Sequence, residues 1–76
     1  MEFHERLREA RLRAGLTQKE VADRVGWAGG DAVYRRYESG AATPSIELAT
    51  RMADALGVSL DWLAGRTDKM ELDSEN

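Results

Sequence analysis

At 76 residues the chain accommodates a single domain and is too short for a second hydrophobic core. It contains no cysteine, which excludes disulfides and thiolate metal sites, and no apolar run approaches the ~20 residues that a membrane helix needs. The net charge of −3 is unevenly spread, because residues 1–40 carry eight basic and seven acidic side chains and residues 41–76 carry three and seven. We expect a soluble, cytoplasmic domain whose charge permits a nucleic-acid partner without favouring one.

Apolar side chains recur with a helical period in the first stretch of the chain and predict a helix over residues 2–14. A glycine follows, where a left-handed helix terminator is expected. The run from Thr17 to Glu20 is a capping box, in which the threonine hydroxyl and the glutamate carboxylate satisfy free backbone amides reciprocally. We therefore expect a second, short helix that begins after Thr17 and ends at Gly26.

The stretch from Trp27 to Gly30 contains two consecutive glycines and predicts a turn. Trp27 either fills the core beneath this turn or stays partly exposed. Asp31 is a favoured N-cap residue, so a third helix is predicted over residues 32–39, with Gly40 as its terminator. Two short helices joined in this way are the arrangement of a helix-turn-helix.

Two further helices are predicted in the second half of the chain. Ser45 is the expected cap of a fourth helix, and Ser59 is the expected cap of a short fifth helix. The acidic stretch that follows has no apolar periodicity. We therefore expect an all-α bundle of five helices over residues 1–66 and a frayed, acidic tail over residues 67–76.

Several separate signatures follow one another along the chain and carry a resemblance. They are LTQKEVA at 16–22, YESG at 37–40, PSI at 44–46 and ALGVSLDWL at 55–63. In order and spacing they resemble the Cro-and-phage-repressor family of helix-turn-helix domains, over roughly residues 5–65. The resemblance implies a transcriptional regulator, of the repressor type, whose third helix enters the DNA major groove. It also implies a homodimer on a palindromic operator.

One departure from the family pattern lies between the second and third helices. The chain has two more residues there than the usual pattern, and the surplus lies in the turn from Trp27 to Gly30. A longer turn tilts the third helix or brings the loop itself to the DNA backbone. The departure therefore bears on base contacts more than on the fold.

The resemblance assigns DNA contacts to the second and third helices. Arg36 is the expected base reader, because a guanidinium forks to guanine O6 and N7, and Arg35 is expected at a phosphate. Gln18 either donates to a phosphate or braces the third helix. Asp31 either caps the third helix or accepts from a cytosine amine. The remaining candidates are Thr17, Ala32, Val33, Tyr37, Ser39 and Thr43. Ala32 and Val33 are expected to touch thymine methyls, and Tyr37 is expected in the core with its hydroxyl donating to a phosphate. Ser39 and Thr43 either contact phosphates or are plain loop residues.

Two further groups have expected structural roles. Arg11 and Glu38 resemble the family's buried ion pair, which ties the third helix to the first. Leu60, Trp62 and Leu63 lie on the last helix and serve either the core or a dimer interface. Because the apolar residues near this end exceed what a core of this size must bury, we expect partial use as an interface.

No enzymatic activity, cofactor or metal site is expected, because the only histidine, His4, has no cysteine or paired nucleophile to act with. The rival to a regulator is an antitoxin or small adaptor whose main partner is another protein. A titration with duplex DNA separates the two, since the regulator predicts an affinity that falls steeply with salt.

Overall fold

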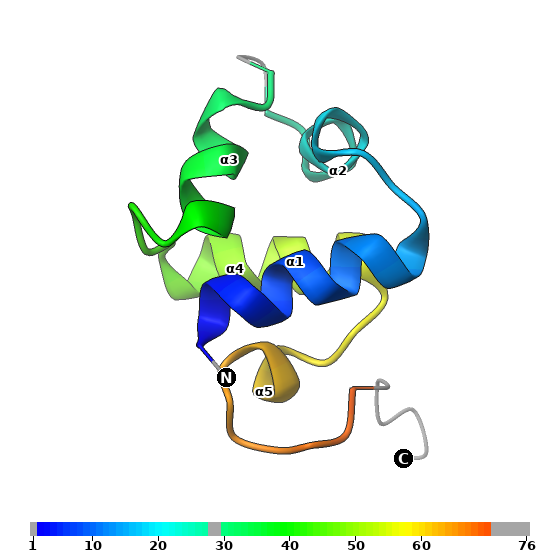
Figure 1. Cartoon of the computed structure of the whole chain (residues 1–76), viewed down its shortest axis with the longest axis vertical. Helices are drawn as coiled ribbons and strands as arrows, with labels where there is room; N and C mark the ends of the chain where they lie inside the picture. Colours follow the sequence, from blue (N-terminus) through cyan, green and yellow to red (C-terminus); the bar gives the residue numbers. More distant parts are fainter. Residues whose placement is uncertain (1, 28–29, 71–76) are drawn as a thin grey trace.

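The computed structural model describes residues 2–27 and 30–70, in which helices form the structure and a single β-bridge residue, Val58, stands outside them. The helices are α1 (Phe3–Ala14), α2 (Gln18–Val25), α3 (Ala32–Ser39), α4 (Ile46–Leu56) and α5 (Leu60–Leu63). In Figure 1, α2 and α3 lie at one end of the molecule, α5 lies at the other, and α1 and α4 cross between them. The predicted all-α fold of five helices is confirmed. None of the described helices has the length and apolarity that crossing a membrane requires.

Local hydrogen bonds set most of the helix ends. Thr17 Oγ1 accepts from the Glu20 amide at 3.0 Å while Glu20 Oε1 accepts from the Thr17 amide at 2.8 Å, so the predicted capping box is confirmed. The hydroxyls of Ser45 and Ser59 each accept a hydrogen bond from the backbone amide three residues further on, at 3.1 and 2.9 Å. Four helices end at a glycine in the left-handed conformation, which L side chains adopt only at a cost: Gly15, Gly26, Gly40 and Gly57.

Side chains from all five helices meet in one core. Its largest fully buried members are Tyr34, Leu7, Met52, Leu63 and Val21. Trp62 is only 5% exposed and Leu63 is not exposed at all, so the expected interface role of these two residues is wrong. The physical reason is that α5 lies against both α1 and α4, and the domain core absorbs its apolar side chains. Leu60 alone of the predicted interface residues remains half-buried.

The chain folds back on the domain after α5. The Ser59 amide donates to the Met70 carbonyl at 2.9 Å, and the Arg6 guanidinium donates to the Thr67 carbonyl at 2.9 Å. The expected frayed tail is therefore wrong for residues 67–70, which contact α1 and the start of α5. The rest of that tail, residues 71–76, lies outside the described residues.

Candidate nucleic-acid interface

Helix α3 has a buried face and an exposed face. Tyr34 and Glu38 point into the protein and are 0% and 7% exposed. The opposite face exposes side chains that the sequence singled out, namely Ala32, Val33, Arg35, Arg36 and Ser39. An α-helix of this length, about 12 Å, is short enough to lie within one turn of a DNA major groove.

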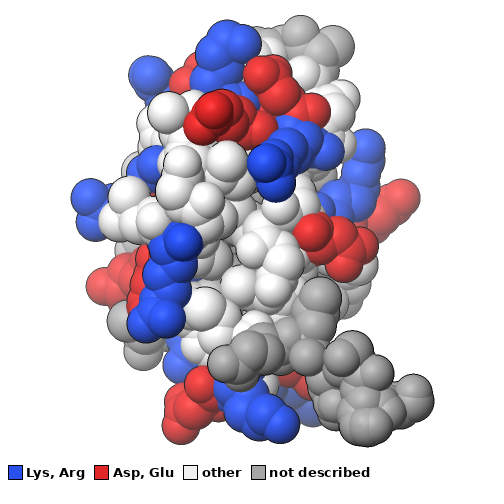
Figure 2. All heavy atoms as spheres, turned by 90° about the vertical axis from the view of Figure 1, so that its right-hand side faces the viewer, with Lys and Arg blue, Asp and Glu red and all other residues white. Residues whose placement is uncertain are grey.

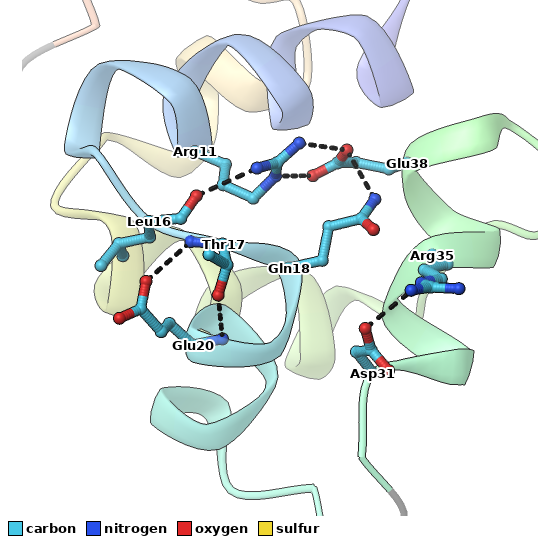
Figure 3. A network of polar contacts seen from close by, with 8 residues as sticks. All are labelled: Arg11, Leu16, Thr17, Gln18, Glu20, Asp31, Arg35 and Glu38. Atoms are coloured by element: carbon cyan, nitrogen blue, oxygen red, sulfur yellow. Dashed lines mark hydrogen bonds and ion pairs between the residues drawn. The ribbon is translucent and has the colours of Figure 1, made fainter.

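A buried carboxylate fixes the position of α3. Glu38 Oε2 lies 2.6 Å from Arg11 Nε, and Glu38 Oε1 accepts hydrogen bonds from Arg11 Nη2 at 3.2 Å and from the side-chain Nε2 of Gln18 at 3.1 Å (Figure 3). Arg11 also donates to the Leu16 carbonyl at 3.0 Å. The expected Arg11–Glu38 pair is thus present, and one carboxylate joins side chains from α1, α2 and α3. Gln18 braces α3 in this structure, whereas its contact with a phosphate stays a prediction.

The surroundings of this carboxylate shift three pKa values. Burial alone would raise the pKa of Glu38, but the Arg11 guanidinium, helped by the Tyr34 hydroxyl and the Gln18 amide, brings that pKa below its ordinary value. The hydrogen bond to Glu38 raises the pKa of Arg11. Burial, and the negative carboxylate of Glu38 close by, raise the pKa of Tyr34, although its hydroxyl does not reach hydrogen-bond geometry with any described residue. The pair is therefore charged at neutral pH, and the tyrosine is neutral.

The amino end of α3 differs from the prediction. Asp31 Oδ2 lies 3.2 Å from Arg35 Nε, one turn further along the helix, and the Asp31 side chain accepts no hydrogen bond from the backbone of α3 (Figure 3). Its φ of −97° and ψ of 4° also depart from the extended geometry of a capping residue. Asp31 therefore occupies the predicted N-cap position, but its side chain does not supply the expected capping hydrogen bond. Arg35 is held by this ion pair, whereas the exposed Arg36 forms no ion pair with another described residue.

The aromatic residues around the turn pack together. The Trp27 ring lies with its centroid 6.0 Å from that of Tyr34 and 6.0 Å from that of Tyr37. Trp27 and Tyr37 are half-buried, so Trp27 covers the core and keeps one side open. The sequence did not predict this aromatic contact, although the aromatic character of all three residues was visible in it. The longer turn itself includes residues 28 and 29, which lie outside the described residues.

The other predicted contact residues do not all share one surface. Thr17 is exposed at the start of α2 with its hydroxyl engaged in the capping box. The Ser39 hydroxyl donates to the Arg36 carbonyl at 3.1 Å. Thr43 lies in the wall of an apolar groove between the start of α4 and α5. The structure therefore brings the candidates of α2 and α3 together and places Thr43 in the wall of a separate groove.

The charge on the α2 side of the molecule is mixed. Figure 2 shows basic and acidic side chains interspersed around an uncharged central strip on the face that lies to the right in Figure 1. Such a face lacks the single-signed field that attracts a polyanion. Nor do three His, Asp or Glu side chains gather anywhere in residues 2–27 and 30–70 as a metal ion would require. The exposed face of α3 remains the candidate interface.

Comparison with known proteins agrees with this geometry. A family model described as helix-turn-helix matches residues 7–63, from the middle of α1 to the end of α5. The transcriptional repressor RstR of the cryptic phage CTXphi in Vibrio cholerae serotype O1 is 39% identical over 66 residues, which are 87% of this chain and 57% of that protein.

Two relatives come from Bacillus subtilis. The uncharacterized HTH-type transcriptional regulator YonR, derived from the SPbeta prophage, is 38% identical over 61 residues, or 80% of this chain and 55% of that protein. The HTH-type transcriptional regulator ImmR is 32% identical over 68 residues, or 90% and 52%. The chain thus spans about half the length of the relatives it matches. The family model extends from Leu7 in α1 to the end of α5, and α2 and α3 form the helix-turn-helix motif. The chain therefore belongs to the helix-turn-helix family, in its Cro-and-phage-repressor branch.

Proposed function

We propose that this chain is a sequence-specific, double-stranded DNA-binding transcriptional regulator of the phage-repressor type, which reads the major groove with α3. The observation that carries the proposal is the exposed Arg36 on a helix whose opposite face is fixed through Glu38 to α1 and α2. A guanidinium discriminates guanine only when its helix is held rigidly, because both hydrogen bonds of the fork depend on orientation. The printed names of the relatives support the same class.

Phosphate contacts fit the amino end of α2 and the flank of α3. The Gln18 side-chain amide carries two N–H groups, and the bond to Glu38 uses one of them, so the other is able to reach a phosphate. The partial positive charge at the start of α2 adds to this attraction. Arg35 meets a phosphate in exchange for Asp31, while Tyr37 and Ser39 complete the contacts with the DNA backbone.

We further propose that a homodimer binds a palindromic operator and that the two copies meet at the apolar groove between α4 and α5. Ile46 is 79% exposed, far more than any other large apolar side chain among the described residues. The groove around it is lined by apolar residues from three parts of the chain: Phe3, Pro44, Ile46, Ala49 and Leu60. Burying this surface against a second copy removes it from water, which a lone protomer does not achieve.

The rim of the same groove carries opposite charges. Asp61 and Arg66 both line it, and both are exposed. In a two-fold dimer the same surface patch of both copies forms the interface. Arg66 of one protomer is therefore able to face Asp61 of the second. Self-complementary charge around an apolar centre favours a second copy as the occupant. The two α3 helices then read half-sites about one helical turn apart.

A cytoplasmic location and the absence of enzymatic activity belong to the same proposal, since both follow from a regulator of this class. The rival, an antitoxin or small adaptor with a protein as its main partner, has no specific contact or surface in its favour. It predicts no salt-dependent affinity for duplex DNA, whereas the regulator predicts a log–log slope of about −0.9 for each phosphate contacted.

Selection of bound sequences from random duplexes tests the proposal. We expect enrichment of a palindrome, and substitution Arg36→Ala is expected to relax the preference at one base pair of each half-site by ~1–3 kcal/mol. Arg13→Ala is the matched control, because Arg13 is equally basic and pairs with Glu9. It lines a pocket together with Asp68 and Met70. A uniform loss of affinity across all sequences in Arg36→Ala would make Arg36 a phosphate contact, and no enrichment at all would refute DNA readout.

The dimer has its own variant. Ile46→Glu is expected to shift the protein to a monomer in sedimentation equilibrium and to abolish the advantage of the palindrome over a single half-site. Leu12→Glu is the control, since Leu12 is 54% exposed on α1, outside the groove. If Ile46→Glu sediments like the unaltered chain, the copies meet elsewhere.

A further inference from the structure

A short segment beyond α5 is held against the domain. We call residues 66–70 the strap. Ser59, the residue that caps α5, donates from its amide to the Met70 carbonyl at 2.9 Å and from its hydroxyl to the Lys69 carbonyl at 3.3 Å. In Figure 1 the strap is the orange segment that loops beside α5. It lies outside residues 7–63, so the family match does not account for it.

One arginine of α1 joins the strap to the end of α5. Arg6 Nη1 donates to the Trp62 carbonyl at 2.6 Å and to the Thr67 carbonyl at 2.9 Å. Its guanidinium carbon lies 4.9 Å from the Trp62 ring centroid, and Nη2 lies 3.5 Å from Asp68 Oδ1. The Arg6 side chain is only 13% exposed. A single planar group thus contacts α5 and the strap simultaneously.

The carbonyl contacts of Arg6 outweigh its ion pair. The Asp68 side chain is fully exposed, so water and salt screen its attraction to the guanidinium. The two carbonyls are bonded in a shielded site, where hydrogen bonds from a charged donor are the strong ones. Arg6 Nε is buried without a hydrogen-bond partner among the described residues, which is a cost that a solubilising surface arginine would not incur. Arg6 is therefore placed for a structural task.

The task follows from the shortness of α5. With four residues, α5 has little helical stability of its own, so it depends on contacts with the rest of the domain, namely the core packing of Trp62 and Leu63 and the bonds of Arg6. Leu60 of α5 and Arg66 at the start of the strap both line the groove around Ile46. We propose that Arg6 is a positioning residue: by locking the strap and the end of α5 onto α1, it sets the shape of the groove at which a second copy docks. This role rests on the dimer proposed above.

The test compares Arg6→Gln and Arg6→Lys with Arg8→Gln, a control at an exposed arginine on the same helix. Three quantities are measured: hydrogen exchange of the Ser59 amide, the dimer dissociation constant by sedimentation equilibrium, and affinity for a duplex with one half-site. Arg6→Gln is expected to speed Ser59 exchange and to weaken the dimer, each by about tenfold or more, which corresponds to the loss of hydrogen bonds from a charged donor.

The affinity of Arg6→Gln for a single half-site is expected to match that of the unaltered chain, because α2 and α3 lie at the other end of the molecule. A merely structural weakening would lower this affinity together with dimerisation. Arg6→Lys is expected to resemble Arg6→Gln, since an ammonium keeps the charge but lacks the flat guanidinium, which bonds two carbonyls through Nη1 while Nη2 faces Asp68 and the group lies over the Trp62 ring. Full rescue by lysine would overturn the geometric argument.

Two results would overturn the role of Arg6 while leaving the dimer intact. One is a Ser59 amide in Arg6→Gln that exchanges as slowly as in the unaltered chain. The other is a Ser59 amide that exchanges faster while the dimer dissociation constant is unchanged. Should Arg6→Gln not fold, Gly65→Ala strains the turn into the strap, where φ is 83°, and leaves Arg6 in place. It is expected to change the same two quantities in the same direction, and no change in either would count against the proposal. An unaltered chain that remains monomeric on a palindrome would instead refute the dimer itself.

Discussion

Replacing Glu38 with alanine is expected to remove the main polar connection between α3 and the rest of the domain. The Glu38 side chain is 4% exposed and that of Arg11 13%, so the pair is largely shielded from water. Truncation leaves the guanidinium without its counter-ion and the Gln18 amide without its acceptor. Loss of one partner of a buried pair costs ~3–5 kcal/mol, against ~5–15 kcal/mol for the whole stability of a typical domain.

Urea unfolding followed by circular dichroism measures this cost, and thermal unfolding is expected to show a midpoint lower by roughly 12 °C or more. Glu47→Ala is the matched control, because Glu47 is exposed in the first turn of α4 and its loss affects only a helix-dipole interaction of under ~1 kcal/mol. The double variant Arg11→Met/Glu38→Leu is expected to be more stable than Glu38→Ala, since it removes both charges together.

The same pair predicts how stability changes with pH. The folded-state pKa of Glu38 lies below the ordinary value of 4.5, so the unfolded chain binds this proton more readily than the folded one. The ionised carboxylate therefore stabilises the fold above pH 4.5, and this stabilisation is lost as the pH falls through the lowered folded-state pKa. The stability gap between the unaltered chain and Glu38→Gln is expected to narrow over that range. A gap that stays constant, or a Glu38→Ala variant no weaker than Glu47→Ala, would refute the reasoning.

Three other substitutions have clear expected outcomes. Asp31→Asn removes an acid from the start of α3 and frees Arg35, so affinity for duplex DNA and the steepness of its salt dependence should both rise; a weaker complex would mean that Asp31 contacts a base. Tyr34→Phe removes a buried hydroxyl that lacks a hydrogen bond but helps to lower the pKa of Glu38, so urea denaturation should show at most a small loss of stability, of under ~1.5 kcal/mol. Gly40→Ala places a Cβ on a residue with a φ of 85°, 3.2 Å from the His4 ring. We expect a stability loss of ~1–3 kcal/mol in the same assay, and an unchanged stability would argue against backbone strain at this position.

The helices themselves were predictable because their signals are local. The Thr17–Glu20 capping box and the glycine that follows each of the first four helices act within about four residues, and the observed α3 has the predicted bounds of 32–39. The order of short motifs along the chain was enough to recognise the family. The partnership of Arg11 with Glu38, 27 residues apart, came from that resemblance, since no local rule links two such distant side chains.

Local rules were insufficient wherever competing partners come from different parts of the chain. Asp31 stands at the N-cap position of α3, yet its carboxylate pairs with Arg35 one turn further along the helix and does not bond the helix backbone. Sequence reasoning treated Trp62 and Leu63 as surplus apolar residues, whereas in the structure α5 packs against α1 and α4 and both side chains enter the core. Residues 67–70 carry no periodicity, and they are held on the domain by Arg6, some sixty residues away, and by the backbone amide and hydroxyl of Ser59. Sequence alone therefore determined where the helices begin and end, whereas the tertiary structure decided which side chains are buried and which polar groups meet, because burial depends on contacts between distant segments.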